Sequence, residues 1–176
     1  MKIILALLLT FQTFAAQSPK SFELLLKKEG FRSKPYDDIT GKTLTKKDIV
    51  SGNYTGTPTI GYGTVIPKVW YKKDWLYWGL SKKNARKWAK HHPVRKQVNK
   101  RIARVSRALT QDQEDVLHEV GYNIGPTALG RIIQTLNKEG FRQAAKHLMK
   151  FTQSKGVVLP GLVKRRKEEA KRLRGK

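Results

Sequence analysis

The sequence predicts an α+β fold of two lobes, a small β-containing lobe near the N-terminus and a larger helical lobe after it. Two observations lead to this prediction. Residues 31–63 are rich in glycine, proline and β-forming residues, whereas apolar residues after residue 82 recur mostly at helical spacing. The 176 residues suit one domain, and a domain of that size buries about two thirds of its unfolded surface.

The first sixteen residues have the three parts of a secretory signal peptide. They begin with a basic residue, continue with an apolar run over residues 3–9 and end with small residues at Ala15 and Ala16. The apolar part is too short for a stable membrane span, and polar residues interrupt it without helical spacing, which disfavours a core helix. We therefore expect residues 1–16 to be an export signal, cleaved or released from the membrane, and residues 17–176 to form the folded domain.

The first helix of the folded domain is predicted from its two ends. Ser18 is a suitable N-cap, Pro19 fits the first helical position, and apolar residues follow from Phe22 at helical spacing. Gly30 should end the helix. Residues 31–63 then predict a small, irregular sheet.

The rest of the chain is predicted to be mainly helical. Residues 65–79 contain three of the four tryptophans and show no clear period, so Trp70, Trp75 and Trp78 are expected to pack in the core or between the lobes, with sugar stacking as the alternative. Thr110 and Gln113 suit a capping box. Helices are expected over 82–107 as a pair divided at Pro93, from Thr110 to Ile124, and over 128–138, 140–152 and 162–173.

Charge and cysteine content limit the function classes. Lys and Arg number 37 against 13 Asp and Glu, a formal net charge of +24, which indicates an anionic partner or surroundings. The absence of cysteine excludes disulfides, thiolate nucleophiles, Cys-ligated zinc and iron–sulfur clusters.

The basic runs at residues 82–107 and 164–176 leave three interpretations open: a nucleic-acid-binding protein, a cationic protein that disrupts anionic envelopes without catalysis, or a solvated face. The signal-like start argues against specific nucleic-acid binding. Cell-wall polymers and lipopolysaccharide phosphates would be sufficient anionic targets.

Two carboxylates are candidates for acid–base chemistry. Glu29 lies seven residues after Phe22 and therefore on the same face of the helix. A carboxyl there is either partly desolvated, which would raise its pKa as a general acid requires, or bends out to solvent. Asp37 and Asp38 follow in a turn, where carboxylates are usually solvated or cap local N–H groups. Such a pair of carboxylates is what glycoside hydrolysis needs.

These residues belong to a longer pattern that resembles the phage-type lysozymes, glycoside hydrolase family 24. The family places Glu-Gly at the end of its first helix, an Asp nine residues later, and a Thr that opens a Thr-Ile-Gly-x-Gly turn. The similar segments are residues 29–38 (EGFRSKPYDD), 59–64 (TIGYGT), 109–113 (LTQDQ), 121–126 (GYNIGP) and 159–166 (LPGLVKRR) with Glu169.

The resemblance implies a lysozyme-like fold and a monomeric peptidoglycan hydrolase without a cofactor, exported to the periplasm or the exterior. It implies Glu29 as the general acid, with Asp38 and Thr59 positioning the attacking water in an inverting reaction, for which the carboxylates should stand roughly 6.5–9.5 Å apart. Substrate contacts are expected at Tyr36, Gly61 and Tyr62. The alternative is a lytic transglycosylase, which would not require Asp38 or Thr59.

The segment between Asp38 and Thr59 departs from the family pattern because its twenty residues replace a short turn. It is either a lengthened hairpin that contacts substrate or a tolerated surface insertion, and residues 51–57 are expected to form a loop. His118 and Glu119 resemble the start of a zinc-protease helix, but the second His is missing, so no metal site is expected. His91, His92 and His147 are expected on the surface.

Overall fold

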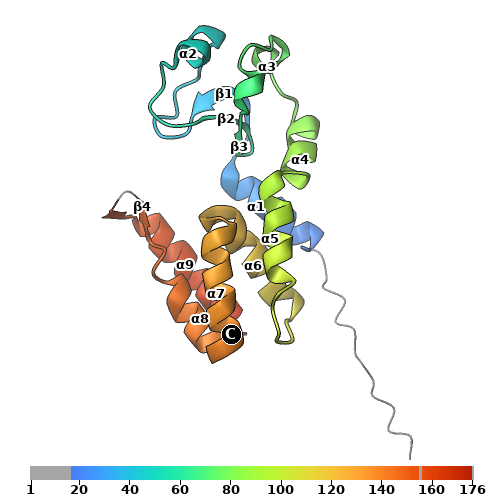
Figure 1. Cartoon of the computed structure of the whole chain (residues 1–176), viewed down its shortest axis with the longest axis vertical. Helices are drawn as coiled ribbons and strands as arrows, with labels where there is room; N and C mark the ends of the chain where they lie inside the picture. The colour runs from blue at the N-terminus through green and yellow to red at the C-terminus, as the bar shows by residue number, and fades with distance from the viewer. Residues whose placement is uncertain (1–16, 155, 176) are drawn as a thin grey trace, which may run out of the picture.

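The computed structural model describes residues 17–154 and 156–175 (Figure 1). The export signal expected at residues 1–16 lies outside the described residues. Among the helices of the described part, none has both the length and the apolar character needed to cross a membrane.

Helix α1 (Pro19–Glu29) begins and ends as predicted. The side chain of Ser18 accepts a hydrogen bond from the backbone N–H of Ser21, and Pro19 occupies the first turn. Gly30 follows with a positive φ of 70°, and its N–H bonds to the carbonyl of Leu26. Because the helix stops there, Glu29 is its last residue and lies directly before the small lobe.

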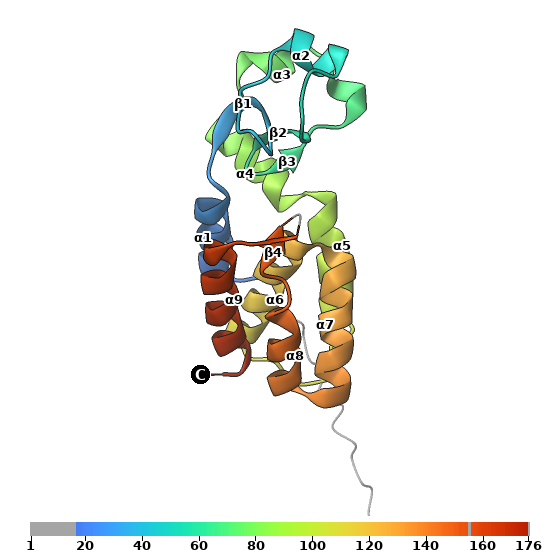
Figure 2. The same cartoon turned by 90° about the vertical axis from the view of Figure 1, so that its left-hand side faces the viewer.

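The small lobe contains an antiparallel sheet in the order β1-β2-β3, formed by β1 (Arg32–Asp37), β2 (Pro58–Gly61) and β3 (Thr64–Val65). Tyr36 of β1 lies opposite Thr59 of β2. Figure 2 shows this sheet at one end of the molecule with α2 (Lys46–Ser51) and α3 (Trp75–Trp78), while the larger helices fill the other end. The α+β prediction is confirmed.

The segment between β1 and β2 is more ordered than the sequence suggested. It contains α2, which begins at a capping box in which Thr45 and Asp48 bond each other's backbone N–H groups. Ser51 is therefore helical, and the expected loop is confined to residues 52–57. The Thr45-x-x-Asp48 spacing is itself a local helix-start signal in the sequence.

The helical lobe surrounds α6 (Gln111–Ile124), in which every residue from Gln113 to Gly121 is buried. Helix α6 contacts α5, α7 and α9, and apolar residues of all four helices and of α8 form one core cluster. The other helices after residue 80 are α4 (Lys82–Lys90), α5 (Pro93–Ile102), α7 (Pro126–Glu139), α8 (Phe141–Leu148) and α9 (Pro160–Leu173).

Two predicted helix ends are wrong. Helix α5 stops at Ile102, because the chain turns to dock on α7, where Asn137 accepts the Ser106 N–H and the Leu136 carbonyl accepts Arg107 Nε. Helix α8 stops at Leu148 and is followed by a short hairpin of β4 (Gln153–Ser154) and β5 (Val157–Val158) that was not predicted.

The tryptophans divide between packing and exposure. Trp70 packs on the small-lobe core, with its ring 5.4 Å from Trp75 and 5.3 Å from Trp88. Trp75 is 39% exposed and Trp78 is 79% exposed. Core packing is thus confirmed for Trp70, partial for Trp75 and wrong for Trp78, which lies in the four-residue α3 with only Leu76 buried.

Candidate active site

Glu29 projects from the end of α1 toward the turn between β2 and β3. A Cβ added at Gly63 would lie 3.5 Å from Glu29 Oε2, and Gly63 has a positive φ of 72°, so both space and backbone favour glycine there. Glu29 is half-buried, and burial raises its pKa, although Arg165 and Lys28 act in the opposite direction. The carboxyl is therefore suited to holding a proton.

The phenol of Tyr36 is influenced by the charges of both predicted carboxylates, Glu29 and Asp38. Burial raises the pKa of this half-buried phenol, Arg32 lowers it, and the charges of Glu29 and Asp38 raise it further. Both carboxylates thus lie within electrostatic reach of one hydroxyl. Thr59 pairs with Tyr36 across the sheet, and cross-strand partners share a face.

Asp38 and Thr59 meet at the peptide groups of Thr57. The Thr57 N–H donates to Asp38 Oδ1 at 2.6 Å, and the Thr57 carbonyl accepts the Thr59 hydroxyl at 2.9 Å. The Asp38 N–H donates to the same carbonyl at 3.3 Å. Asp38 is exposed and Thr59 is buried, so one side chain reaches solvent and the other is fixed in the sheet.

Asp37 caps backbone N–H groups, which is one of the two roles expected for a carboxylate in this turn. Only 1% of it is exposed, and its carboxylate accepts backbone N–H groups from Ile39, Thr40, Thr55 and Gly56. Hydrogen bonds from Gly56 and Thr40, the largest of these contributions, hold its pKa well below the usual range. Asp37 therefore fastens the inserted segment to the end of β1.

Gly56 allows this close approach. A Cβ at residue 56 would lie 2.7 Å from Asp37 Oδ1 and would collide with the Asp38 carboxylate. The inserted segment thus supplies both the N–H donors and the space that the two neighbouring carboxylates require.

The other predicted substrate contacts are largely packed. Gly61 is buried, and a Cβ there would lie 3.2 Å from side chains of Ala85 and Leu80. Tyr62 is half-buried with its ring 5.4 Å from that of Phe31. Substrate binding by Gly61 and Tyr62 stays a prediction.

Tyr122 of α6 belongs to this site but was not identified from the sequence. Its hydroxyl donates to the Tyr62 carbonyl at 3.1 Å, and burial, with a contribution from Glu29, raises its pKa to about 12. Tyr122 lies in the family-like segment 121–126, but local spacing does not predict this contact, because it joins residues sixty positions apart.

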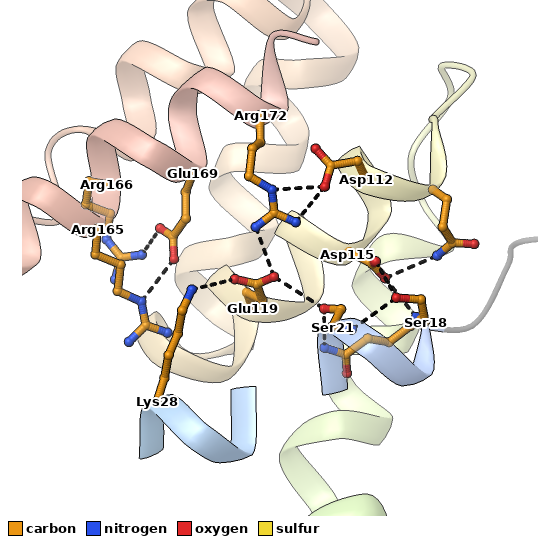
Figure 3. Close-up of polar contacts among 12 residues, drawn as sticks. Ser18, Ser21, Lys28, Asp112, Asp115, Glu119, Arg165, Arg166, Glu169 and Arg172 are labelled. Carbon is orange, nitrogen blue, oxygen red and sulfur yellow. Dashed lines mark hydrogen bonds and ion pairs between the residues drawn. The ribbon is translucent and has the colours of Figure 1, made fainter. Parts of the chain in front are cut away.

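Two cations that act on Glu29 are bonded to buried carboxylates of the helical lobe (Figure 3). Lys28 Nζ lies 3.1 Å from Glu119 Oε2, and Arg165 Nε lies 3.0 Å from Glu169 Oε1. Neither carboxylate was singled out as a site residue.

Histidine and acidic residues form no metal-binding group of three or more within residues 17–154 and 156–175. His118 is buried in α6, and burial lowers its pKa to about 4. His91 is exposed, as expected, whereas His92 and His147 are half-buried. Their Nδ1 atoms contact the Val94 N–H at 3.3 Å and Thr135 Oγ1 at 2.9 Å.

Comparison with known proteins agrees with this architecture. The family model described as phage lysozyme matches residues 26–169. An endolysin of Bacillus phage B103 is 43% identical over 63 residues, which make up 35% of this chain and 24% of that relative. The match therefore spans about a quarter of the curated relative's length.

Solved structures resemble the whole fold. The endolysin from Escherichia coli O157:H7 phage FAHEc1 superposes with a TM-score of 0.64 and 25% identity, over 93% of this chain and 96% of that one. The muramidase domain of SpmX from Asticaccaulis excentricus gives a TM-score of 0.64 at 23% identity, over 90% and 97% of the two chains, a likeness of fold.

Proposed function

The chain belongs to the phage lysozyme family, and from this premise we propose that it is an endolysin that hydrolyses the β-1,4 bond between N-acetylmuramic acid and N-acetylglucosamine in peptidoglycan. The observation that carries the proposal is the raised pKa of Glu29, a half-buried carboxyl at the end of α1 next to a glycine turn. A carboxyl whose protonated form is favoured by burial is suited to protonating the leaving glycosidic oxygen.

Asp38 and Thr59 would activate the water. The Thr59 hydroxyl donates its proton to the Thr57 carbonyl, so its oxygen presents lone pairs to a water molecule. Asp38 is exposed and can accept the proton that the attacking water loses. Attack by a water on the face of the sugar opposite Glu29 would invert the anomeric configuration.

The decisive experiment incubates the protein with purified peptidoglycan and identifies the soluble products by mass spectrometry. Glu29→Gln keeps the shape but cannot donate a proton, so we expect its rate to fall at least about 100-fold. Glu23→Gln, an exposed change on the same helix, is the matched control. Asp38→Asn and Thr59→Ala should also lose activity.

The products separate the competing reactions. Reducing N-acetylmuramic acid ends would support a muramidase, and an initial α-anomer detected by NMR would support inversion. Anhydro ends would identify a lytic transglycosylase. An unimpaired Glu29→Gln variant would overturn the assignment.

We also propose an anionic partner in the cell envelope, bound by a groove of about 280 Å³ between α8 and α9. Four cations and three apolar residues line it, and none of these side chains is acidic. Across the described residues, none of its four cations forms an ion pair. The cations are Arg142, Lys146, Lys167 and Arg174, and the apolar residues are Ala145, Met149 and Ala170.

Charge reversal tests this groove. A Lys146→Glu, Lys167→Glu double variant should release from anionic cell-envelope fragments at lower salt than the native protein, because screening weakens charge-dependent binding. The matched control, Lys72→Glu with Lys83→Glu, changes exposed lysines elsewhere by the same total charge. Equal losses in both variants would show that binding depends on total charge alone.

Export by residues 1–16 and a monomeric state complete the proposal. Mass determination of the secreted protein would reveal a cleaved N-terminus, and light scattering would reveal any oligomer.

A further inference from the structure

Two cations from different helices act on Glu29, yet neither is hydrogen-bonded to it in the described part of the chain. Lys28 precedes it on α1, and Arg165 lies on α9. Both favour the ionised form of the Glu29 carboxyl, but burial is the larger effect. Each of these cations also forms an ion pair with a buried carboxylate (Figure 3).

Lys28 is engaged by Glu119 of α6. Glu119 is fully buried, and its Oε2 lies 3.1 Å from Lys28 Nζ. Its other oxygen accepts Arg172 Nη1 at 3.1 Å and the Ser21 hydroxyl at 3.3 Å. One carboxylate thus ties α1 to α6 and α9, and fixes the residue beside Glu29.

Arg165 is engaged in the same way by Glu169, one turn further along α9. Glu169 is 1% exposed, and its Oε1 lies 3.0 Å from Arg165 Nε. Its Oε2 contacts Arg166, whose guanidinium also contacts Asn123 of α6 and the Phe151 carbonyl. Within the described residues, Arg165 Nη2 is buried without a hydrogen-bond partner, so Glu169 is the anion that holds this guanidinium.

We propose that Glu119 and Glu169 are positioning residues that hold Lys28 and Arg165 in ion pairs near Glu29, so that these cations favour the ionised form of Glu29 less than free cations would. This inference rests on the proposed role of Glu29 as general acid. An uncompensated cation within about 4–6 Å typically lowers a carboxyl pKa by one to three units, which would favour the ionised form of Glu29.

Two phenols and the exposed carboxylate of Asp38 also belong to this site. Tyr36 of β1 and Tyr122 of α6 both respond to the charge of Glu29, and both phenols have raised pKa values. The protonation of Glu29 should therefore depend on the two cations and their buried partners, with opposite signs. Loss of the Glu169 charge should lower the Glu29 pKa, and loss of the Arg165 charge should raise it.

The test titrates the Glu29 carboxyl directly by 13C NMR, with the resonance assigned from Glu29→Gln. We expect its midpoint to fall by about one pH unit in Glu169→Gln and to rise by a similar amount in Arg165→Met. Glu168→Gln and Lys164→Met are matched controls, because they remove the same charges from exposed neighbours on α9. They should leave the midpoint within about 0.2 units.

An unchanged midpoint in both Glu169→Gln and Arg165→Met, or equal shifts in the controls, would overturn the proposal. Glutamine retains an acceptor for Arg166, and Glu169→Asp, which keeps the charge, should restore the native midpoint. If Glu169→Gln does not fold, Glu119→Gln provides the second test, since it leaves Lys28 uncompensated and should also lower the midpoint.

The same variants should shift the alkaline limb of the pH profile of kcat/KM on peptidoglycan, to lower pH in Glu169→Gln and to higher pH in Arg165→Met. The NMR titration needs no catalysis, so the two proposals fail separately. A native protein that cleaves no peptidoglycan would refute the proposed function, while the titration would still decide whether the buried carboxylates control Glu29.

Discussion

The helical lobe buries fifteen residues in its apolar cluster, whereas the corresponding cluster of the small lobe buries five in the described chain. The small lobe compensates with half-buried aromatic residues and with polar contacts to the backbone. Asp37 alone accepts four backbone N–H groups. The comparison indicates that apolar burial stabilises one lobe, while directed hydrogen bonds define the shape of the other.

The largest expected effect tests the apolar core of the helical lobe. Leu129 of α7 is fully buried, and Leu129→Ala should reduce the free energy of unfolding by about 3–5 kcal/mol, because it removes apolar contacts and leaves a cavity. Urea unfolding measures this. Ile60→Ala, the matched change at a buried position of β2, should cost less. A larger loss of unfolding free energy in Ile60→Ala than in Leu129→Ala would contradict this comparison of the two lobes.

The next effect tests a buried titratable group of the helical lobe. Between its ordinary pKa of 6.5 and its folded value of about 4, His118 binds a proton in the unfolded chain but not in the folded one. The free energy of unfolding should therefore fall by up to about 3 kcal/mol as the pH drops through this range.

His118→Gln should flatten that pH dependence of stability, measured as melting temperature from pH 7 to pH 4. Burial raises the pKa of the nearby Glu114, which acts in the opposite direction and reduces the net slope. The exposed His91→Gln is the control and should behave like the native protein. If the melting temperature of His118→Gln depends on pH as steeply as that of the native protein, His118 is not the group responsible for that dependence.

A more local effect is expected in the small lobe. Asp37→Asn removes the charge that the four N–H groups stabilise, so the segment around Thr55 and Gly56 should open more often. Amide hydrogen exchange at these two residues should accelerate, while exchange in α6 stays unchanged. Because the folded pKa of Asp37 is lowered, native protein should show the same acceleration only as the pH falls below about 3.8. Asp74→Asn, an exposed carboxylate in the same lobe, is the control.

The smallest effect concerns the exposed tryptophan. Trp78→Ala should change the free energy of unfolding by less than about 0.5 kcal/mol, because the side chain is 79% exposed. Trp70→Ala, which breaks the aromatic cluster, should cost several times more. If Trp78→Ala weakens binding to glycan fragments at unchanged stability, the ring is a sugar platform.

The elements that the sequence predicted best depend on neighbours a few residues apart. Ser18, Pro19 and Gly30 set the bounds of α1, and Thr110 with Gln113 starts α6, because caps and helical spacing are local. The placement of Glu29 on the buried side follows from the same spacing. The resemblance to a known family added Asp38 and Thr59, which periodicity could not have provided.

The parts that were missed depend on contacts between distant segments. Local sequence identifies Asp37 only as a turn residue, whereas in the fold it also accepts the N–H groups of Thr55 and Gly56. Tyr122 joins the site because its hydroxyl donates to the carbonyl of Tyr62, sixty residues earlier. Arg165 and Glu169 are spaced as an ordinary helical ion pair. Only the folded chain shows that Glu169 is buried and that the charge of Arg165 acts on Glu29.

Gly56 has a consequence for how this chain can vary among relatives and in engineered forms. The insertion between Asp38 and Thr59 can change in length or composition only if its replacement brings backbone N–H donors to both carboxylates and has no side chain at the point of closest approach. We therefore expect variation to be tolerated around α2 and strongly restricted at residues 55–57. A loop graft that preserves those three positions should keep the lobe intact, and one that ends in a bulkier residue should not.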